Sequence, residues 1–410
     1  MKDTNLILSK IKEFRNNTLA FFTAYMPEAG EIRAKIPSRA KLTIQDIILR
    51  IWLLIQPFIF RRKLPKYVFI SKVFPHIMST LQPKEVMVMG GRKELIFCLK
   101  NGYRFYWLGA IFYGFNQFIF SEKNNLFSLV VVSLRKMFSK DINKRYLFLC
   151  DDSLPEGMTL SFALESIPNL NIVCIAHGII NFEPSRIKII PEGISCKFNL
   201  LWDKSQKFFF KDDKNHASFV LGLPYEVSLP KNHCREVILV GDCGLSSNAV
   251  RYFYALYVFC KIYRILEAAG IDVSYRPHPQ DDIEYVQSIF SNVCITQKNE
   301  LLTSNRKVFI GYESSLIFEA GNFGHTTIGL DALELMESKY FEHKDNRAFD
   351  VDFEVSSDNF ENLPSLVLDI FEKSIFAEVD EIKNLKSRFN KCLNQIDDFS
   401  LTNESASLIV

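Results

Sequence analysis

The 410-residue sequence has no uninterrupted apolar run of the roughly 20 residues that a helix needs to cross a bilayer. The stretch taken as nearest to such a run, residues 44–60, is broken by Asp46, Arg50 and Pro57. Charged residues also interrupt the first segment, MKDTNLILSKIKEFRNN, which excludes a secretory signal peptide. We therefore expect a cytoplasmic protein. The basic residues 61–63 leave two interpretations of the apolar stretch: a core helix with a solvated end, or a helix lying on the anionic inner face of the membrane.

Paired cysteines and an excess of charge are also lacking. The nine cysteines are scattered, odd in number and never spaced as CxxC, which disfavours a zinc site or a disulfide framework and favours buried, reduced thiols. A net charge of +2 without a basic tail argues against nucleic acid as the main partner.

Continuous apolar runs separated by helix-length segments dominate what is present. Residues 85–91, 145–152 and 171–178 read as strands without polar alternation, as in a parallel sheet covered on both faces. The pattern stops near residues 219–236, a proline-containing linker, and a second α/β pattern follows.

The chain length and this repeated pattern predict an α/β protein of GT-B type, in which two Rossmann-like parallel-sheet domains face a central cleft. We expect the N-terminal, acceptor-binding domain over residues 1–228 and the C-terminal, nucleotide-donor-binding domain over 236–410, with the last helices as candidates to return to the first domain. Such folds bind ligands at the carboxyl ends of their strands. The candidate residues at those ends are Asp151, Asp152, His177, Gly241, Asp242, His278, Ser314 and Ser315. Gly241 and Asp242, with Gly244 in the glycine-rich turn that follows, are expected to bind the nucleotide phosphate.

The phrase SYRPHPQDD follows a predicted strand. Pro277 and Pro279 restrict the residues before them, Arg276 and His278, to extended geometry. A histidine fixed there can stabilise or protonate a leaving phosphate, and an arginine can bind a phosphate with two hydrogen bonds. The alternative is a turn in which His278 caps backbone groups.

The phrase FIGYESSLIFEAG places Ser314 and Ser315 at the start of a helix. Hydroxyl groups, free backbone N–H groups and the positive end of the helix dipole together suit a phosphate. Glu319, one turn further on, could bind ribose hydroxyls. Plain N-capping by serine is the alternative.

The phrase FLCDDSLPEG lies in the other domain. Asp151 and Asp152 end a strand, with Glu156 close behind, and adjacent carboxylates suit general-base catalysis. They could equally bind a metal or cap the helix expected near Met158. His177, at the end of a neighbouring strand, is a second candidate base.

These phrases, in this order, resemble the motifs of bacterial GT-B sialyltransferases, and most of all the capsular polysialyltransferases: an acidic D/E-D/E-G motif, a His-Pro motif and a Ser-Ser motif. The resemblance implies an inverting transfer of sialic acid, or a related nonulosonate, from a CMP-sugar to a capsule or lipo-oligosaccharide glycan, with no metal or other cofactor required. It implies Asp151 or Asp152 as base, His278 as phosphate stabiliser and acid, and Ser314 and Ser315 as phosphate clamp. Ser153 stands where the acidic motif has glycine, which leaves Glu156, followed by Gly157, as an alternative base.

A second resemblance is to teichoic-acid glycerophosphotransferases, which use CDP-glycerol and have a His-Gly strand end and an RxHP phrase. The segments AHGII and RPHP fit that pattern and imply His177 as the base. Capsule transferases that use CMP-Kdo are similar in layout. An inactive glycan-binding or capsule-assembly scaffold is the non-enzyme alternative, and contact with capsule-assembly proteins is expected in either case.

Overall fold

A computed structural model describes most of both predicted domains. The described residues are 64–107, 124–139, 143–150, 155–176, 196–209, 216–226, 229–230, 232–241, 249–278, 281–290, 293–296, 305–312, 314–330, 351–373 and 384–407, with a few isolated helical residues before residue 56. The basic residues 61–63, which follow the apolar stretch 44–60, lie outside them. No helix within the described ranges is long and apolar enough to cross a membrane.

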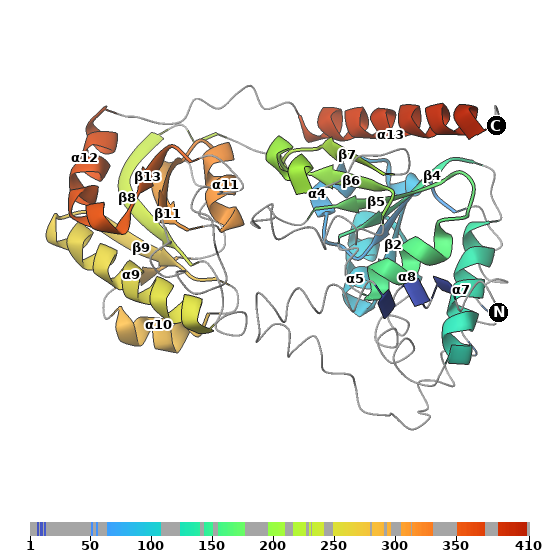
Figure 1. The fold of residues 1–410 in the computed structure, drawn as a ribbon, viewed down its shortest axis with the longest axis horizontal. Helices are drawn as coiled ribbons and strands as arrows, with labels where there is room; N and C mark the ends of the chain where they lie inside the picture. Colours follow the sequence, from blue (N-terminus) through green and yellow to red (C-terminus); the bar gives the residue numbers. More distant parts are fainter. Residues whose placement is uncertain are drawn as a thin grey trace.

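A seven-stranded parallel sheet forms the first domain within these residues, in the order β3-β2-β1-β4-β5-β6-β7 (Figure 1). The strands are β1 (Tyr67–Ile70), β2 (Val86–Gly90), β3 (Arg104–Trp107), β4 (Arg145–Leu149), β5 (Leu170–Ile175), β6 (Phe198–Leu201) and β7 (Ala217–Val220). The first domain also contains α4 (Pro75–Ser79), η1 (Pro83–Glu85), α5 (Arg92–Asn101), α7 (Asn124–Phe138), α8 (Pro155–Leu164) and η4 (Lys204–Phe209).

Both faces of this sheet are covered, which explains why its strands read as continuous apolar runs. On one face Leu134 of α7 and Leu160 of α8 pack against Val68 and Leu147. On the other face α4 and α5 pack with the opposite side chains of the same strands.

A six-stranded parallel sheet forms the second domain, in the order β10-β9-β8-β11-β12-β13. Its strands are β8 (Asn232–Val240), β9 (Asp272–Arg276), β10 (Cys294–Ile295), β11 (Asn305–Gly311), β12 (Thr326–Leu330) and β13 (Phe353–Val355). Its helices are α9 (Ala249–Ala268), α10 (Ile283–Ile289), α11 (Ser315–Asn322), η7 (Ser357–Asn362) and α12 (Leu363–Lys373).

Each sheet has its first strand near the middle, with the second and third strands on one side and the fourth on the other. This is the Rossmann strand order, and the chain reverses direction across the sheet between β1 and β4, and again between β8 and β11. The predicted fold class, two Rossmann-like parallel-sheet domains of GT-B type, is confirmed by these two sheets. Their switch points define where a ligand is expected.

The linker is shorter than the sequence predicted. Residues 219–236 lack apolar periodicity, yet β7 runs to Val220 and β8 already begins at Asn232. Asn232 pairs with Asn305 of β11 through the backbone, and its side chain is exposed. The pairing does not depend on apolar side chains, so the start of the strand leaves no mark in the sequence.

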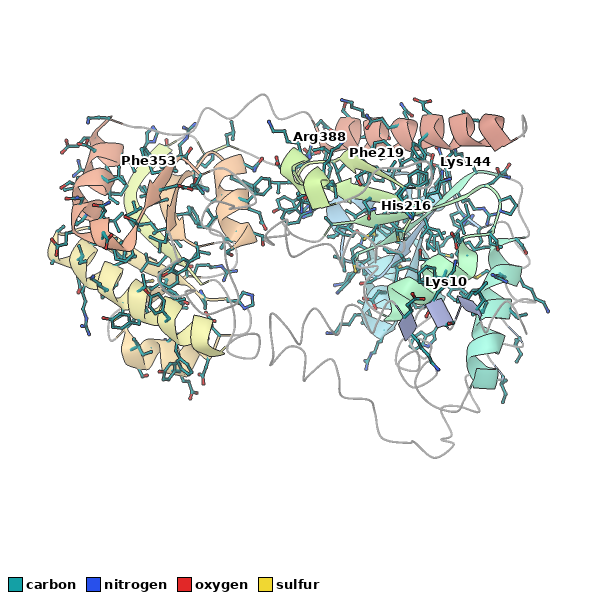
Figure 2. All side chains as sticks on the ribbon, in the orientation of Figure 1. Lys10, Lys144, His216, Phe219, Phe353 and Arg388 are labelled. Atoms are coloured by element: carbon teal, nitrogen blue, oxygen red, sulfur yellow. The ribbon has the colours of Figure 1, made fainter. Side chains whose placement is uncertain are left out.

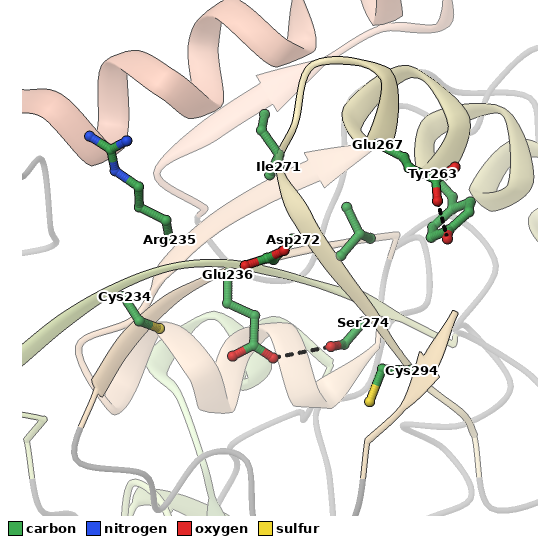
Figure 3. Close-up of a pocket in the computed structure, with 10 residues that line it drawn as sticks. Cys234, Arg235, Glu236, Tyr263, Glu267, Ile271, Asp272, Ser274 and Cys294 are labelled. Atoms are coloured by element: carbon green, nitrogen blue, oxygen red, sulfur yellow. Dashed lines mark hydrogen bonds between the residues drawn. The ribbon is translucent and has the colours of Figure 1, made fainter. Parts of the chain in front are cut away.

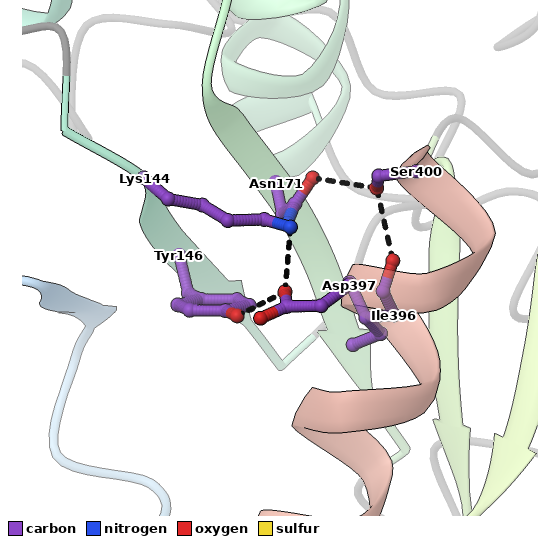
Figure 4. Close-up of polar contacts among 6 residues, drawn as sticks. All are labelled: Lys144, Tyr146, Asn171, Ile396, Asp397 and Ser400. Carbon is purple, nitrogen blue, oxygen red and sulfur yellow. Dashed lines mark hydrogen bonds and ion pairs between the residues drawn. The ribbon is translucent and has the colours of Figure 1, made fainter. Parts of the chain in front are cut away.

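The last helix, α13 (Leu385–Ser407), lies along the first domain (Figure 1). Its Phe389 and Ile396 complete the core on the α4 and α5 side of the first sheet. Polar contacts fix the same helix: Asp397 forms an ion pair with Lys144 at 2.9 Å and accepts a hydrogen bond from the Tyr146 hydroxyl (Figure 4). Burial and the nearby Asp397 carboxylate raise the pKa of Tyr146, so the hydroxyl stays protonated as a donor.

A smaller apolar cluster joins the two domains. Trp202 of the first domain stacks on Phe318 of α11, with ring centroids 6.5 Å apart, and Leu223 of the linker belongs to the same cluster. The beginning of α13 holds this linker. The Arg388 guanidinium, labelled in Figure 2, donates to the carbonyl oxygens of Leu221, Leu223 and Tyr225 at 2.7, 2.9 and 3.2 Å.

Candidate functional site

Strand register brings the predicted phrases of the second domain to one edge of its sheet. Val240 pairs with Arg276 of β9 on one side and with Gly311 of β11 on the other. The residues that follow these three, Gly241 and the segments beginning at Pro277 and Tyr312, therefore leave the sheet side by side. This is the carboxyl edge at the switch point, where α/β folds bind ligands.

The turn that carries His278 is closed by an aspartate. The backbone N–H of His278 donates to Asp281 Oδ2 at 2.8 Å, and the backbone N–H of Asp281 donates to the His278 carbonyl at 2.9 Å. The Tyr275 hydroxyl donates to the same Asp281 oxygen at 3.1 Å. His278 is therefore fixed by Asp281 and by the proline before it, and its side chain is partly accessible.

Gly241 supports this turn from the neighbouring strand. Its backbone N–H donates to the Arg276 carbonyl at 2.8 Å. A Cβ atom at this position would lie 2.7 Å from the backbone nitrogen of His278 and 2.8 Å from the Tyr275 hydroxyl. The close approach of the two chain segments requires glycine here.

The Ser-Ser phrase begins α11 as the sequence predicted. Ser314 has the extended backbone of an N-cap, and its hydroxyl accepts from the backbone N–H of Leu316 at 3.4 Å. Ser315 is the first helical residue, and both serine side chains are partly accessible. Ile317 packs within 3.2 Å of the position that a Cβ at Gly311 would occupy, so this glycine lets the helix lie close to its strand.

Glu319 links the two phrases. It is partly buried on α11, and the positive charge of Arg276 acts to lower the pKa of its carboxyl group. The Tyr225 hydroxyl acts in the same direction, but desolvation outweighs both and raises the pKa of Glu319 above its ordinary value of 4.5. A carboxyl group at this place on α11 can accept hydrogen bonds from a polyol, while Arg276 at the end of β9 can bind an anion.

The predicted acids of the first domain follow the corresponding switch point. β4 pairs with β1 and ends at Leu149, two residues before Asp151. Asp151, Asp152 and His177 themselves lie outside the described residues. Glu156 is in the first turn of α8, which begins at Pro155, earlier than the predicted start near Met158.

Asp242, Gly244 and Pro279 also lie outside the described residues. Among the residues that are described, no group of three His, Cys, Asp or Glu side chains is arranged to hold a metal ion.

A cavity of about 480 Å³ lies at the opposite edge of the second sheet (Figure 3). Glu236, Glu267 and Asp272 line it, and Glu236 accepts a hydrogen bond from Ser274 at 3.1 Å and pairs with Lys307 at 2.7 Å. Its lining comes from the amino ends of β8 and β9. Position and acidic character both disfavour this cavity as a site for a nucleotide phosphate.

Two residues of the site were not singled out by sequence reasoning. Asp281 is present in SYRPHPQDD, and its position three residues after His278 is the spacing at which an aspartate closes a turn. Tyr225 lies in the linker and reaches the second domain, where its ring is 6.0 Å from that of Phe323. A tyrosine between two prolines gives no sequence signal for such a contact.

No protein-family model and no curated protein matches the chain. Several solved structures resemble it, and three of them are compared by sequence identity, TM-score and the share of each chain that is covered. The UDP-GlcNAc 2-epimerase from Methanocaldococcus jannaschii is 10% identical with a TM-score of 0.48, covering 80% of this chain and 99% of its own. The wall teichoic acid polymerase TagF is 10% identical with a TM-score of 0.40, covering 87% and 97%.

The calicheamicin glycosyltransferase CalG4 is 8% identical with a TM-score of 0.38, covering 84% of this chain and 98% of its own. Because all three TM-scores are below 0.5, the fold is assigned from the strand order of the two sheets. The substrates of these proteins carry no conclusion for this chain.

Proposed function

We propose that the chain is an inverting glycosyltransferase that transfers sialic acid, or a related nonulosonate, from a CMP-sugar to an envelope glycan. The observation that carries the proposal is the strand register that places the RPHP phrase, after Arg276, and the Ser-Ser phrase, after Gly311, on either side of Val240 at the switch point of the second sheet. Two phrases separated by more than thirty residues in sequence converge where a nucleotide phosphate would bind.

The residues at the carboxyl edge of the second sheet and the two aspartates of the first domain each have a role in the proposed reaction. The acceptor hydroxyl attacks the anomeric carbon of the donor, the bond from that carbon to the CMP phosphate oxygen breaks, and CMP leaves. Asp151 or Asp152 takes the hydroxyl proton, and His278 stabilises or protonates the leaving phosphate. Ser314, Ser315 and the positive end of the α11 dipole bind the phosphate, together with Arg276.

Glu319 fits the ribose of the donor. Two vicinal hydroxyls can donate to one carboxylate, and the buried position lowers competition from water. Tyr225 of the linker packs against the end of the same helix, with its ring 6.0 Å from that of Phe323, which brings the junction of the two domains close to the helix that carries Glu319.

Thermal stabilisation by nucleotides tests the donor class. CMP is expected to raise the melting temperature, while AMP and UMP raise it less at equal concentration, because a ligand that binds only the folded chain stabilises it in proportion to its affinity. Equal responses to the three nucleotides contradict a cytidine donor. The variant Ser314→Ala with Ser315→Ala should lose most of the CMP response.

Turnover of CMP-sialic acid with a glycan acceptor tests the catalytic roles. His278→Ala is expected to lower kcat by about a hundredfold or more, the usual contribution of a general acid. Asp151→Ala or Asp152→Ala should abolish turnover while CMP still stabilises the chain. A near wild-type rate in His278→Ala would overturn its assigned role.

A donor comparison separates the related activities. The chain is tested with CMP-sialic acid, CMP-Kdo and CDP-glycerol, and with His177→Ala beside the two aspartate variants. Transfer from CDP-glycerol that depends on His177 favours glycerophosphotransfer, the second resemblance of the sequence. Binding of CMP without transfer from any of the three donors favours a binding protein or scaffold.

A further inference from the structure

One face of the first domain combines exposed apolar and basic side chains. We infer that it docks on an anionic lipid bilayer. The face, called here the α5 face, belongs to α5 and to the end of the neighbouring edge strand β3. Its residues are Arg92, Lys93, Ile96, Leu99, Lys100 and Trp107.

Helical geometry gathers the five α5 residues together. At 3.6 residues per turn they occupy about a third of the helix circumference, with Ile96 between Arg92 and Lys100. All five are exposed, whereas Cys98 on the other side of α5 is buried in the core. Leu99 is 75% exposed and Ile96 46%, unusual values for two large aliphatic side chains on one helix face.

Trp107 extends this face along the sheet. Side chains alternate along β3, and Phe105 packs into the core on the α5 side, so Trp107 points to that same side. The two rings meet edge to face at 5.9 Å, and Trp107 pairs with Gly90, just before α5 begins. Trp107 is 40% exposed. Tryptophan and long aliphatic side chains are the residues that enter the boundary of a bilayer.

The charges of the α5 face have one sign. The acid of α5, Glu94, turns toward the start of its helix, where its carboxylate accepts from the backbone N–H of Gly91 at 2.9 Å. The exposed charges are therefore Arg92, Lys93 and Lys100. This combination is complementary to anionic lipid headgroups.

The charge pattern also distinguishes a bilayer from other occupants. A symmetric dimer would place the same three cations against their copies, which costs energy. The other cluster of exposed apolar side chains, Phe253 and Tyr257 of α9 with Tyr285 of α10, is flanked by the exposed acids at 282 and 284. That cluster would be repelled by anionic lipid and serves as a comparison.

The inference is independent of the proposed reaction, because it concerns only where the chain binds. The full chain is mixed with phosphatidylcholine vesicles prepared with or without phosphatidylglycerol, and bound protein is measured by sedimentation. We expect binding to the anionic vesicles at low salt, several-fold weaker binding at high salt, and little binding to phosphatidylcholine alone.

Variants then identify the face. Lys93→Ala with Lys100→Ala should lower the partition coefficient by about tenfold or more, and Ile96→Ser with Leu99→Ser should lower it at both salt concentrations. The matched controls are Lys386→Ala with Lys391→Ala and Leu401→Ser, which are exposed residues of α13, and Tyr257→Ser on α9. These should bind like the wild type. Melting temperatures verify that every variant is folded.

Tryptophan fluorescence gives an independent measurement. Anionic vesicles should shift the emission of the wild type to shorter wavelength, and Trp107→Phe should lose that shift. The inference is overturned if neutral and anionic vesicles bind equally, if the α5 variants bind like the wild type, or if the α13 or α9 controls lose as much binding.

Discussion

Asp281 holds His278 by accepting a hydrogen bond from its backbone N–H at 2.8 Å. The same oxygen accepts from the Tyr275 hydroxyl, so one carboxylate connects the strand β9 with the turn that follows it. The position of His278, the predicted general acid, thus depends on Asp281, which has no assigned role in the chemistry. This dependence can be measured separately from catalysis.

Asp281→Ala is expected to lower the free energy of unfolding by about 2 kcal/mol, because two donors lose their acceptor. Turnover should fall further than stability alone explains, since His278 loses its fixed position. Asp282→Ala is the matched control. It removes only the N-cap contact to Tyr285, at 3.1 Å, and should cost about 1 kcal/mol with turnover unchanged. Equal losses of turnover in the two variants contradict the positioning role.

Gly241→Ala tests the close approach beneath the same turn. The added methyl group would lie 2.7 Å from the backbone nitrogen of His278, and neither chain segment can move without breaking the hydrogen bond to Arg276. We expect a loss of about 2 kcal/mol in the free energy of unfolding, measured in urea, and a weaker CMP response. Gly321→Ala, on α11 with its nearest neighbour at 3.6 Å, should be neutral or slightly stabilising.

The pH dependence of stability tests the buried carboxylate. Because burial raises the pKa of Glu319 above 4.5, folding favours its protonated form. Its contribution to stability is therefore most favourable at low pH and declines as the pH rises from 4.5 through the folded pKa. Glu319→Gln should thus gain stability over the wild type at neutral pH, with the difference vanishing toward pH 4. A variant less stable than the wild type at pH 7 would show that Arg276 and Tyr225 outweigh desolvation.

The same variant separates stability from function. Under the proposed function, Glu319→Gln binds CMP more weakly because a neutral amide accepts fewer hydrogen bonds from the ribose. Higher stability without nucleotide and a smaller CMP response are expected together. Such a combination is common where a site retains an unfavourable buried charge for binding.

Arg388→Ala tests the contact between α13 and the linker. Three backbone carbonyls lose a charged donor, and we expect a decrease of about 3 kcal/mol in the free energy of unfolding. Lys391→Ala, exposed on the same helix, should change it by less than about 0.5 kcal/mol. Similar values for the two variants, measured by urea unfolding, would mean that the linker is held by apolar packing alone.

Local patterns predicted the regular elements well. The segments predicted as strands at residues 85–91, 145–152 and 171–178 contain most or all of β2, β4 and β5, and the helix predicted to start at Ser314 and Ser315 is α11. Strand periodicity and helix caps act within a few residues, so they are visible in sequence. The start of β8 was missed because residues 232–236 pair with β11 and β9 through backbone atoms and polar side chains, such as Glu236 with Lys307, and not through an apolar run.

The candidate site was predicted in part. The two phrases at the ends of β9 and β11 were identified, because proline and serine have local conformational effects. The meeting of the RPHP and Ser-Ser phrases depends on strand order, and the contact of Tyr225 with Phe323 depends on how the linker folds back. Neither relationship has a local signal. The acids at 151 and 152 remain a prediction from the sequence.

The return of α13 has a consequence for how the protein is made. The first domain is discontinuous in sequence: Phe389 and Ile396 complete its core, although the whole second sheet is encoded before them. When residues 64–226 have left the ribosome, Tyr146 and Phe148 still lack the helix that covers them. The described strands and helices of the second domain are complete by Lys373 and can fold during synthesis, whereas the core of the first is completed only after α13 has been made.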